Sequence, residues 1–423
     1  TFPSLTVHGA NKAKATEVQQ MEVYVARQPI FDAAHKVFGY ELLFRGGIEG
    51  ALASAGSGHV SLSSVLDAGA ITGGRRAFIR FPGDLIERGA PATVPGDALG
   101  IQIPGDAKPT EELMQVCRSL KQRRYVLALD GFTRGSGQEA LVELADIIKI
   151  SFLRTSTAQR MWLLERPDLG HAAFWASEVH TAKEYREARE LGCSYVQGDF
   201  FTQPVPSRGR TAASYSAAGL QLLSEVQKPE PEFDEMAEII GHDPALSYRV
   251  LRLVNSAAYG LRTEVTSIKH ALLILGMKEI KEWFPLLIMT TLTQDKPDEL
   301  ITVSVVRARF AELTARQTGL VDRSAELFLA GLFSTIDALL DQPMDEAIAG
   351  LPFPVDVQKA LVGQDGPITP LYRLVLAYEQ ARWDEVSQLA ERAGVPEQVL
   401  PRAYAAALSW AREFSEQGGA ARE

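Results

Sequence analysis

The stretch Tyr40-Glu41-Leu42-Leu43-Phe44-Arg45 decides how the rest of this chain is interpreted. It follows an alternating apolar run over residues 23–31 and a second apolar cluster that begins at Val37. Within it, Glu41, Leu43 and Arg45 are spaced as E-x-L-x-R, at a point where a strand is expected to give way to a loop or a helix. An isolated acid and base four residues apart indicate a surface ion pair of roughly a few tenths of a kcal/mol. The surrounding sequence must therefore decide whether the motif carries a function.

The first half of the chain alternates between strand-like and helix-like segments. Short apolar segments that end near a polar residue lie at residues 77–81, 98–103, 125–130, 147–150, 172–176 and 195–197. Between them lie helix-like stretches, such as 110–123 with Thr110 as a candidate N-cap, and 181–191, which ends before Gly192. This alternation is typical of a parallel βα architecture. About seven or eight such units favour a closed (β/α)₈ barrel, in which functional residues lie at the carboxyl ends of the strands.

The text around the first motif, V-A-R-Q-P-I-F-D followed by G-Y-E-L-L-F-R, resembles the opening of EAL domains. These form the cyclic di-GMP phosphodiesterase family, and the resemblance is to the variant fused to an HDOD domain. It implies an EAL-type barrel over residues 22–206 and cyclic di-GMP as the associated ligand. It also implies that active members hold divalent metal with the Glu of E-x-L, an Asn on the second strand, a Glu on the third and further acids downstream.

Some positions of this chain match the family motifs and others depart from them. The matching positions are Glu41, Leu43 and Arg45 of the first motif, Asp130 of L-D-G-F, Lys149 of K-I-S, and the pair Gln197-Gly198 on the last strand. The degenerate positions are Arg80 in place of Asn, Gln102 in place of Glu, Gly131 in place of Asp, Ser151 in place of an acid, and Ser177 and His180 in place of the two Glu residues of A-E-G-V-E-T.

These departures argue against catalysis. Mg²⁺ requires near-octahedral oxygen ligands, and such sites cleave phosphodiesters with a metal-activated water between two metals. The two retained carboxylates, Glu41 and Asp130, are too few for a two-metal site, and Arg80 would repel a dication. We therefore expect no metal, no cofactor and no catalytic residue. In place of the metal we expect Arg80 or Arg45 to pair with Glu41 or Asp130.

The retained residues allow two interpretations. Glu41, Arg45, Asp130 and Lys149 could form a purely structural ion-pair network in the barrel mouth, joined by Arg80. Alternatively, the mouth could still bind cyclic di-GMP without cleaving it, with Arg45 on a phosphate and Gln197 near a guanine. The sequence does not decide between them.

The second half of the chain, residues 217–415, has the pattern of an all-α domain. It follows a predicted linker, residues 207–216, which is rich in small residues. His242-Asp243 is interpreted as a helix N-cap rather than a metal-binding pair, because Pro244 follows at the first helical position. The segments L-R-L-V-N-S-A-A-Y-G and T-S-I-K-H-A-L-L-I-L-G resemble the HDOD domain, a helical relative of the HD phosphohydrolases that lacks their metal ligands. Where an active relative would carry L-H-D, this chain has Leu332-Phe333-Ser334, and a phenylalanine cannot bind metal.

Composition sets the remaining limits. The chain has 423 residues, of which 46% are hydrophobic and 23% charged, so we expect a soluble protein of two domains. The net charge of −10 disfavours general affinity for nucleic acid. No apolar run is long enough for a membrane span, and two cysteines are too few for a disulfide framework, which fits the cytoplasm. We expect residues 1–21 to be a flexible leader and residues 416–423 a flexible tail.

The sequence therefore predicts a bacterial signal-transduction adaptor of the cyclic di-GMP network. Its EAL domain is expected to be inactive, and it is expected to act through contacts with other signalling proteins. A homodimer is one form that such an adaptor could take. A non-hydrolysing cyclic di-GMP receptor and an active phosphodiesterase are the alternatives.

Overall fold

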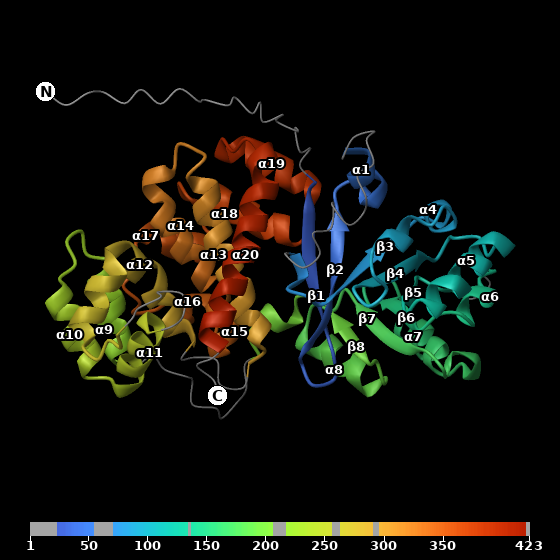
Figure 1. The fold of residues 1–423 in the computed structure, drawn as a ribbon, viewed down its shortest axis with the longest axis horizontal. Helices are drawn as coiled ribbons and strands as arrows, with labels where there is room; N and C mark the ends of the chain where they lie inside the picture. The colour runs from blue at the N-terminus through green and yellow to red at the C-terminus, as the bar shows by residue number, and fades with distance from the viewer. Residues whose placement is uncertain are drawn as a thin grey trace, which may run out of the picture.

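The structure is a computed structural model that describes residues 23–54, 71–133, 137–205, 217–255, 263–290 and 296–419. A strand barrel and a helical half lie side by side (Figure 1). The strands are β1 (Val25–Phe31), β2 (Val37–Phe44), β3 (Arg76–Arg80), β4 (Leu99–Pro104), β5 (Val126–Asp130), β6 (Ile147–Ser151), β7 (Ala173–Ser177) and β8 (Tyr195–Gln197). They close into a barrel in sequence order, which confirms the predicted eight-stranded closure.

One strand departs from the expected parallel arrangement. From β2 to β8 each strand pairs in parallel with the next, but β1 is antiparallel to both β2 and β8. The reason lies in the short turn between β1 and β2, because a parallel pair needs a crossover of a dozen or more residues. The Asp32 carboxylate fixes this turn by accepting hydrogen bonds from the backbone N–H groups of Ala34 (2.8 Å) and Lys36 (2.9 Å).

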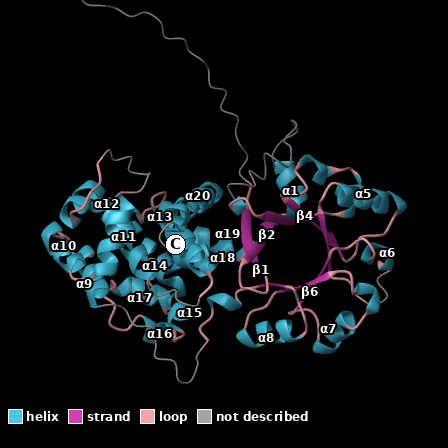
Figure 2. Cartoon of the chain, turned by 60° about the horizontal axis from the view of Figure 1, so that its bottom comes forward, coloured by secondary structure: helices cyan, strands magenta, loops and turns pink. Residues whose placement is uncertain are grey.

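Helices surround the ring of strands (Figure 2). They are α1 (Gly47–Ser54), α4 (Gly83–Glu87), α5 (Glu111–Gln122), α6 (Glu139–Val142), α7 (Thr157–Leu164) and α8 (Ala182–Glu190). The predicted cap of α5 is confirmed, because the Thr110 side chain accepts a hydrogen bond from the N–H of Leu113 at 3.1 Å. Inside the barrel, Phe78 and Trp175 are fully buried. A side chain at Gly100 would come within 2.4 Å of the Phe78 ring, so this position requires glycine.

The helical half is all-α, as expected. Its helices are α9 (Ala217–Val226), α10 (Phe233–Gly241), α11 (Pro244–Val254), α12 (Ile268–Thr290), α13 (Asp298–Ala315), α14 (Ser324–Leu332), α15 (Ile336–Leu340), α16 (Met344–Ala347), α17 (Val355–Leu361), α18 (Thr369–Glu379), α19 (Trp383–Ala393) and α20 (Leu400–Gly419). The Asp243 side chain accepts from the N–H of Leu246 at 3.1 Å, which confirms its role as a cap. Gly276 has a non-helical backbone within α12, with φ of 71°, and marks a kink between two helical segments.

Buried polar contacts join the two halves. The Tyr40 hydroxyl on β2 donates to a carboxylate oxygen of Glu299 on α13 at 2.9 Å. Arg27 on β1 lies 4.0 Å from the same carboxylate, and its guanidinium carbon is 4.3 Å from the centre of the Tyr40 ring. Glu299 is only 6% exposed, so a partner on the barrel side compensates much of the cost of burying it. The helical half is thereby held directly against β1 and β2.

The expected leader, residues 1–21, and the expected linker, residues 207–216, both lie outside the described residues. Helix α20 continues to Gly419 and so extends into the segment expected to be a tail. No helix in the described part of the chain is long and apolar enough to cross a membrane. Cys117 and Cys193 are both buried and unpaired, and burial raises the pKa of each thiol to about 11.

Candidate functional site in the barrel mouth

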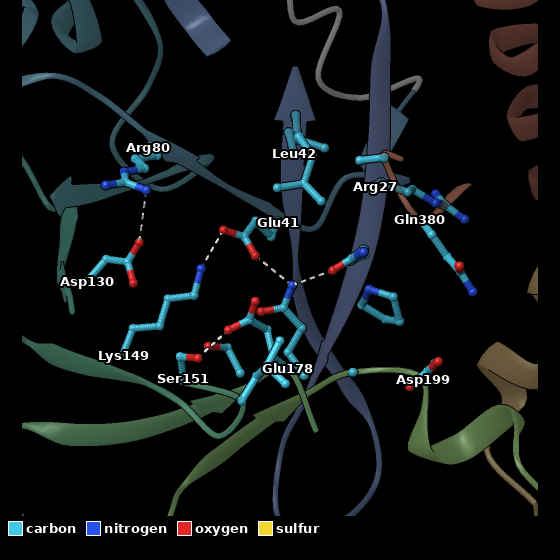
Figure 3. A pocket seen from close by; sticks show the side chains of 18 of the residues that line it. Arg27, Glu41, Leu42, Arg80, Asp130, Lys149, Ser151, Glu178, Asp199 and Gln380 are labelled. Carbon is cyan, nitrogen blue, oxygen red and sulfur yellow. Dashed lines mark hydrogen bonds and ion pairs between the residues drawn. The ribbon is translucent and has the colours of Figure 1, made fainter. Parts of the chain in front are cut away.

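A cavity of about 920 Å³ opens at the barrel mouth (Figure 3). The strands place polar side chains around it because their carboxyl ends meet at one end of the barrel. Arg80 ends β3, Asp130 ends β5, Ser151 ends β6 and Gln197 ends β8. The helical half supplies a further wall, formed by Glu299, Val303, Val306, residues 379–383 and Tyr404.

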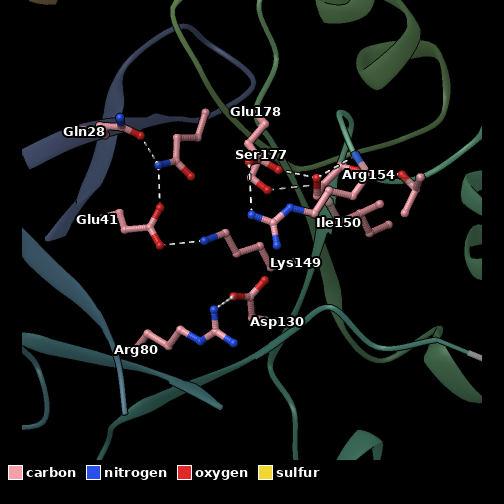
Figure 4. A network of polar contacts seen from close by, with 12 residues as sticks. Gln28, Glu41, Arg80, Asp130, Lys149, Ile150, Arg154, Ser177 and Glu178 are labelled. Carbon is pink, nitrogen blue, oxygen red and sulfur yellow. Dashed lines mark hydrogen bonds and ion pairs between the residues drawn. The ribbon is translucent and has the colours of Figure 1, made fainter. Parts of the chain in front are cut away.

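The floor of this cavity is built around the Glu41 carboxylate. Its Oε1 accepts a hydrogen bond from the Lys149 ammonium at 2.6 Å, and its Oε2 accepts one from Gln197 Nε2 at 2.6 Å (Figure 4). Gln197 Nε2 also donates to Gln28 Oε1 at 2.9 Å, and Lys149 donates to Gln102 Oε1 at 2.9 Å. We call these five residues the floor network. They come from β1, β2, β4, β6 and β8, so the network crosses the barrel interior.

The floor network fixes the charge state of Glu41. Burial by itself would raise the pKa of this carboxyl group. The positive charge of Lys149, and hydrogen bonds from Lys149 and Gln197, outweigh burial and hold the pKa of Glu41 below its ordinary value. Glu41 and Lys149 therefore form a buried ion pair at neutral pH.

The rim of the cavity is more exposed. Arg80 lies 3.8 Å from Asp130, and their side chains are 55% and 20% exposed. Ser151 donates a hydrogen bond to Glu178, and Arg154 lies 3.8 Å from the same carboxylate. We call Arg80, Asp130, Ser151, Arg154 and Glu178 the rim residues. Both arginine contacts are longer than a hydrogen bond, so the rim is held loosely.

A divalent metal does not fit the donors present. Both oxygens of Glu41 already accept hydrogen bonds, and one of them faces the Lys149 ammonium. The Asp130 carboxylate faces Arg80. Within the described ranges, no group of three or more His, Cys, Asp or Glu side chains is placed to hold a metal ion. Mg²⁺ would have to displace a cation from each carboxylate.

The expectation that Arg45 belongs to the mouth is wrong. It follows the last residue of β2 and points to the helical half, where it donates to Glu397 at 2.5 Å and to Ser387 at 2.8 Å. Its guanidinium also lies 5.1 Å from the centre of the Tyr24 ring. Sequence spacing placed Arg45 beside Glu41, but it could not show that another domain would cover this end of β2. Glu41 consequently pairs with Lys149 rather than with an arginine.

Most of the other predicted site residues line the cavity at the barrel mouth. Residues from the predicted set that line the cavity are Glu41, Leu43, Arg80, Asp130, Gly131, Lys149, Ser151, Ser177, His180, Gln197 and Gly198. Gln102 lies beneath it as a partner of Lys149. Ser177 donates to the carbonyl of Ile150 at 3.3 Å, and His180 contacts Asp199 at 2.6 Å.

Phe333 and Ser334 do not line the cavity. Phe333 is fully buried, with its ring 4.7 Å from that of Phe353, and Ser334 accepts from Arg307 at 3.1 Å. In this arrangement they are core residues of the helical half.

The sequence predictions missed several mouth residues. Glu178 occupies the glycine position of the A-E-G-V-E-T signature and has a left-handed backbone, with φ of 56°. A non-glycine residue here is strained, and the mismatch with the signature was a usable signal. Glu299 and Glu379 gave no signal, because nothing in their local pattern indicates that α13 and α18 reach the barrel.

Comparison with known proteins shows which family the chain belongs to. The HDOD domain family matches residues 214–343. The chain is 32% identical over 410 residues to the uncharacterised protein YuxH of Bacillus subtilis, covering 94% of this chain and all of the relative. It is 31% identical over 404 residues to the cyclic di-GMP phosphodiesterase CdgJ of Vibrio cholerae, covering 93% of each. A solved EAL domain protein of Listeria monocytogenes is 18% identical, over 44% of this chain and 90% of that one, with a TM-score of 0.34. With its HDOD match and full-length relatives, the chain belongs to the EAL–HDOD family.

Proposed function

We propose that this chain is a signalling adaptor of the cyclic di-GMP network whose EAL barrel does not cleave the dinucleotide. The observation that carries the proposal is the floor network, in which Lys149 and Gln197 occupy both oxygens of Glu41. A cation and an amide thus stand where the family's metal chemistry would need open carboxylate oxygens. The replacement of aligned ligands by Arg80 and Gln102 supports the same conclusion.

Two other functions have specific support. The name of the V. cholerae relative, a cyclic di-GMP phosphodiesterase, favours an active enzyme. The cavity itself favours a receptor that binds cyclic di-GMP without cleaving it, because a pocket of this size suits a small-molecule ligand. A receptor role is compatible with an adaptor role, whereas an active enzyme would contradict the proposal.

Cleavage is tested on the purified full chain. Cyclic di-GMP is incubated with the protein and with Mg²⁺ or Mn²⁺, and linear pGpG is measured by chromatography. The proposal expects no more pGpG from the wild type than from Glu41→Ala. Product that rises with protein concentration and disappears in Glu41→Ala would show that the chain is an enzyme.

The adaptor role is expected to use the helical half. Helix packing forms grooves for partner segments, and Tyr248 on α11 and Leu273 on α12 are 59% and 58% exposed. Affinity capture from bacterial cells is compared for the wild type, the Tyr248→Ser/Leu273→Ser variant and a matched barrel variant, Leu153→Ser/Met161→Ser. We expect the helical variant to lose specific partners and the barrel variant to keep them. The reverse pattern would place the working surface on the barrel.

A further inference from the structure

The interface between the two halves contains a buried carboxyl group, that of Glu299 at the start of α13. Strands β1 and β2 lie on the side of the barrel that faces the helical half (Figure 1 and Figure 2). From these strands, Arg27 and Tyr40 approach Glu299, whose side chain is 6% exposed. The Tyr40 hydroxyl donates a hydrogen bond to Glu299 Oε2 at 2.9 Å. The barrel thus withdraws an acidic group of the helical half from water.

The negative charge of ionised Glu299 is poorly compensated. Among the described residues, no cation lies closer to this carboxylate than the Arg27 guanidinium, whose distance of 4.0 Å is longer than a hydrogen bond. Arg27 instead donates to the backbone carbonyl oxygen of Ile71 at 2.6 Å. On the barrel floor, by contrast, the Lys149 ammonium reaches Glu41 at 2.6 Å. A buried carboxylate that lacks a close cation is costly to keep ionised.

The other ionisable groups around Glu299 do not make up for this. The groups that face it from the elements packed around it are Arg27 on β1, Tyr40 on β2, Arg75 before β3, Glu379 on α18 and Tyr404 on α20. The Arg75 guanidinium donates to the carbonyl oxygen of Val37, and Glu379 is a second acid. Burial therefore outweighs the positive charges of Arg27 and Arg75 and raises the pKa of Glu299.

The raised pKa of Glu299 couples the contact between the halves to protons. In an open form, in which water reaches the Glu299 carboxyl group, its pKa returns towards the ordinary value of 4.5. The stabilisation that the proton gives to the closed form is therefore fully present below about pH 4.5 and is lost as the pH rises through the closed-form pKa. Glu299 and Arg27 both line the barrel-mouth cavity, so water and protons can reach them without unfolding of either half.

A second ion pair across the interface is more exposed. Arg45, after the end of β2, donates to Glu397 at 2.5 Å, and their side chains are 38% and 33% exposed. Such a pair contributes little to stability because water and salt screen it. The protonation state of Glu299 therefore has the larger influence on whether the interface is closed.

We propose that Arg27, Tyr40 and Glu299 form a proton-dependent clasp that holds the helical half against the barrel. With Glu299 protonated, Tyr40 still donates to a carboxyl oxygen and no negative charge is buried, so the closed form gains stability. With Glu299 ionised, the closed form loses stability, because the carboxylate regains water only when the interface opens. Opening near neutral pH thus releases the proton to solvent. The clasp is a property of the interface and does not depend on binding or cleavage of cyclic di-GMP.

Hydrogen exchange of the full chain, measured by mass spectrometry, tests the clasp. The backbone N–H of Arg27 donates to the Tyr404 hydroxyl at 3.4 Å across the interface, so exchange in residues 23–31 reports its opening. The wild type and Glu299→Gln, which carries a neutral amide, are compared at each of several pH values, so that the pH dependence of intrinsic exchange cancels. At about pH 8 we expect exchange in the wild type to be roughly threefold faster or more. The ratio should fall as the pH is lowered towards about 5.

Glu282→Gln is the matched control. Glu282 on α12 is also an acid whose pKa burial raises, but it lies beside Arg309 within the helical half. This variant should exchange like the wild type in residues 23–31 at every pH. Slower exchange in the wild type than in Glu299→Gln would show instead that the ionised pair closes the interface. Equal exchange at all pH values, or the same change in Glu282→Gln, would show that Glu299 does not control the contact.

The wild type alone provides a test that does not depend on the folding of a variant. Exchange in residues 23–31 is divided by exchange in residues 126–130, on strand β5, in the same sample. This ratio should rise between about pH 5 and about pH 8, because the interface opens more often as Glu299 ionises. A ratio that stays constant or falls would overturn the inference.

Discussion

The ion pair on the floor of the cavity is buried and close, whereas the ion pair on its rim is more exposed and longer. On the floor, Lys149 and Glu41 are 9% and 8% exposed and lie 2.6 Å apart within a network of amides. On the rim, Arg80 and Asp130 are 55% and 20% exposed and lie 3.8 Å apart. A buried ion pair cannot lose one partner without leaving an uncompensated charge, whereas an exposed pair can exchange its partner for water or a ligand. The floor therefore acts as structure, and the rim remains available for binding.

Lys149→Met should have the largest effect on stability. It leaves the Glu41 carboxylate buried without its cation, and breaking a buried pair in this way costs about 3–5 kcal/mol. Urea unfolding measures the loss. The double variant Lys149→Met/Glu41→Gln removes both charges and should recover most of it. A loss below about 1 kcal/mol in the single variant would show that the floor pair is not structural.

The second-largest effect on stability should come from acidification, which removes the contribution of the Glu41 carboxylate in the floor network. The pKa of Glu41 is lowered in the folded protein, so its contribution to stability is fully present above the unfolded value near 4.5 and is lost as pH falls through the folded pKa. Glu299, whose pKa burial raises, is common to both proteins and cancels in a comparison of the wild type with Lys149→Met/Glu41→Gln.

The free energy of unfolding of the wild type minus that of Lys149→Met/Glu41→Gln should be constant above about pH 5.5. Below that pH the difference should shrink, by at most about 1.4 kcal/mol per pH unit. Urea unfolding at a series of pH values measures it. A difference that grows on acidification would mean that Glu41 is not the stabilised carboxylate.

Arg80→Ala should have the smallest effect on stability. The Arg80–Asp130 pair is long and exposed, so its removal should change the free energy of unfolding by less than about 1 kcal/mol. The same urea experiment measures this change. A cost comparable to that of Lys149→Met would show that floor and rim are one structural unit and would end the distinction between them.

Much of the fold could be predicted from local pattern. The apolar segment 77–81 overlaps β3, the segment 195–197 coincides with β8, and the caps at Thr110 and Asp243 were visible in the sequence. The orientation of β1 was missed because strand periodicity is the same in parallel and antiparallel pairs. Attention to the short connection at residues 32–36 would have corrected it.

The site was less predictable than the fold. The resemblance to EAL domains identified Glu41, Asp130 and Lys149, but it did not show which of them would pair, because Glu41 and Lys149 meet across the barrel interior. The position of Arg45 depended on contact between domains, which no local pattern records. The cavity wall formed by residues 379–383 was missed for the same reason, because it also depends on contact between the two domains.

The most direct test of the account is Mn²⁺ binding, measured by calorimetry and electron paramagnetic resonance on the wild type, Glu41→Ala and Lys149→Met. Lys149 donates to a Glu41 oxygen that a metal ion would need as a ligand. We therefore predict that the wild type binds no Mn²⁺ that depends on Glu41, so that the wild type and Glu41→Ala give the same titration. Stoichiometric Mn²⁺ binding by the wild type that is lost in Glu41→Ala would contradict this prediction.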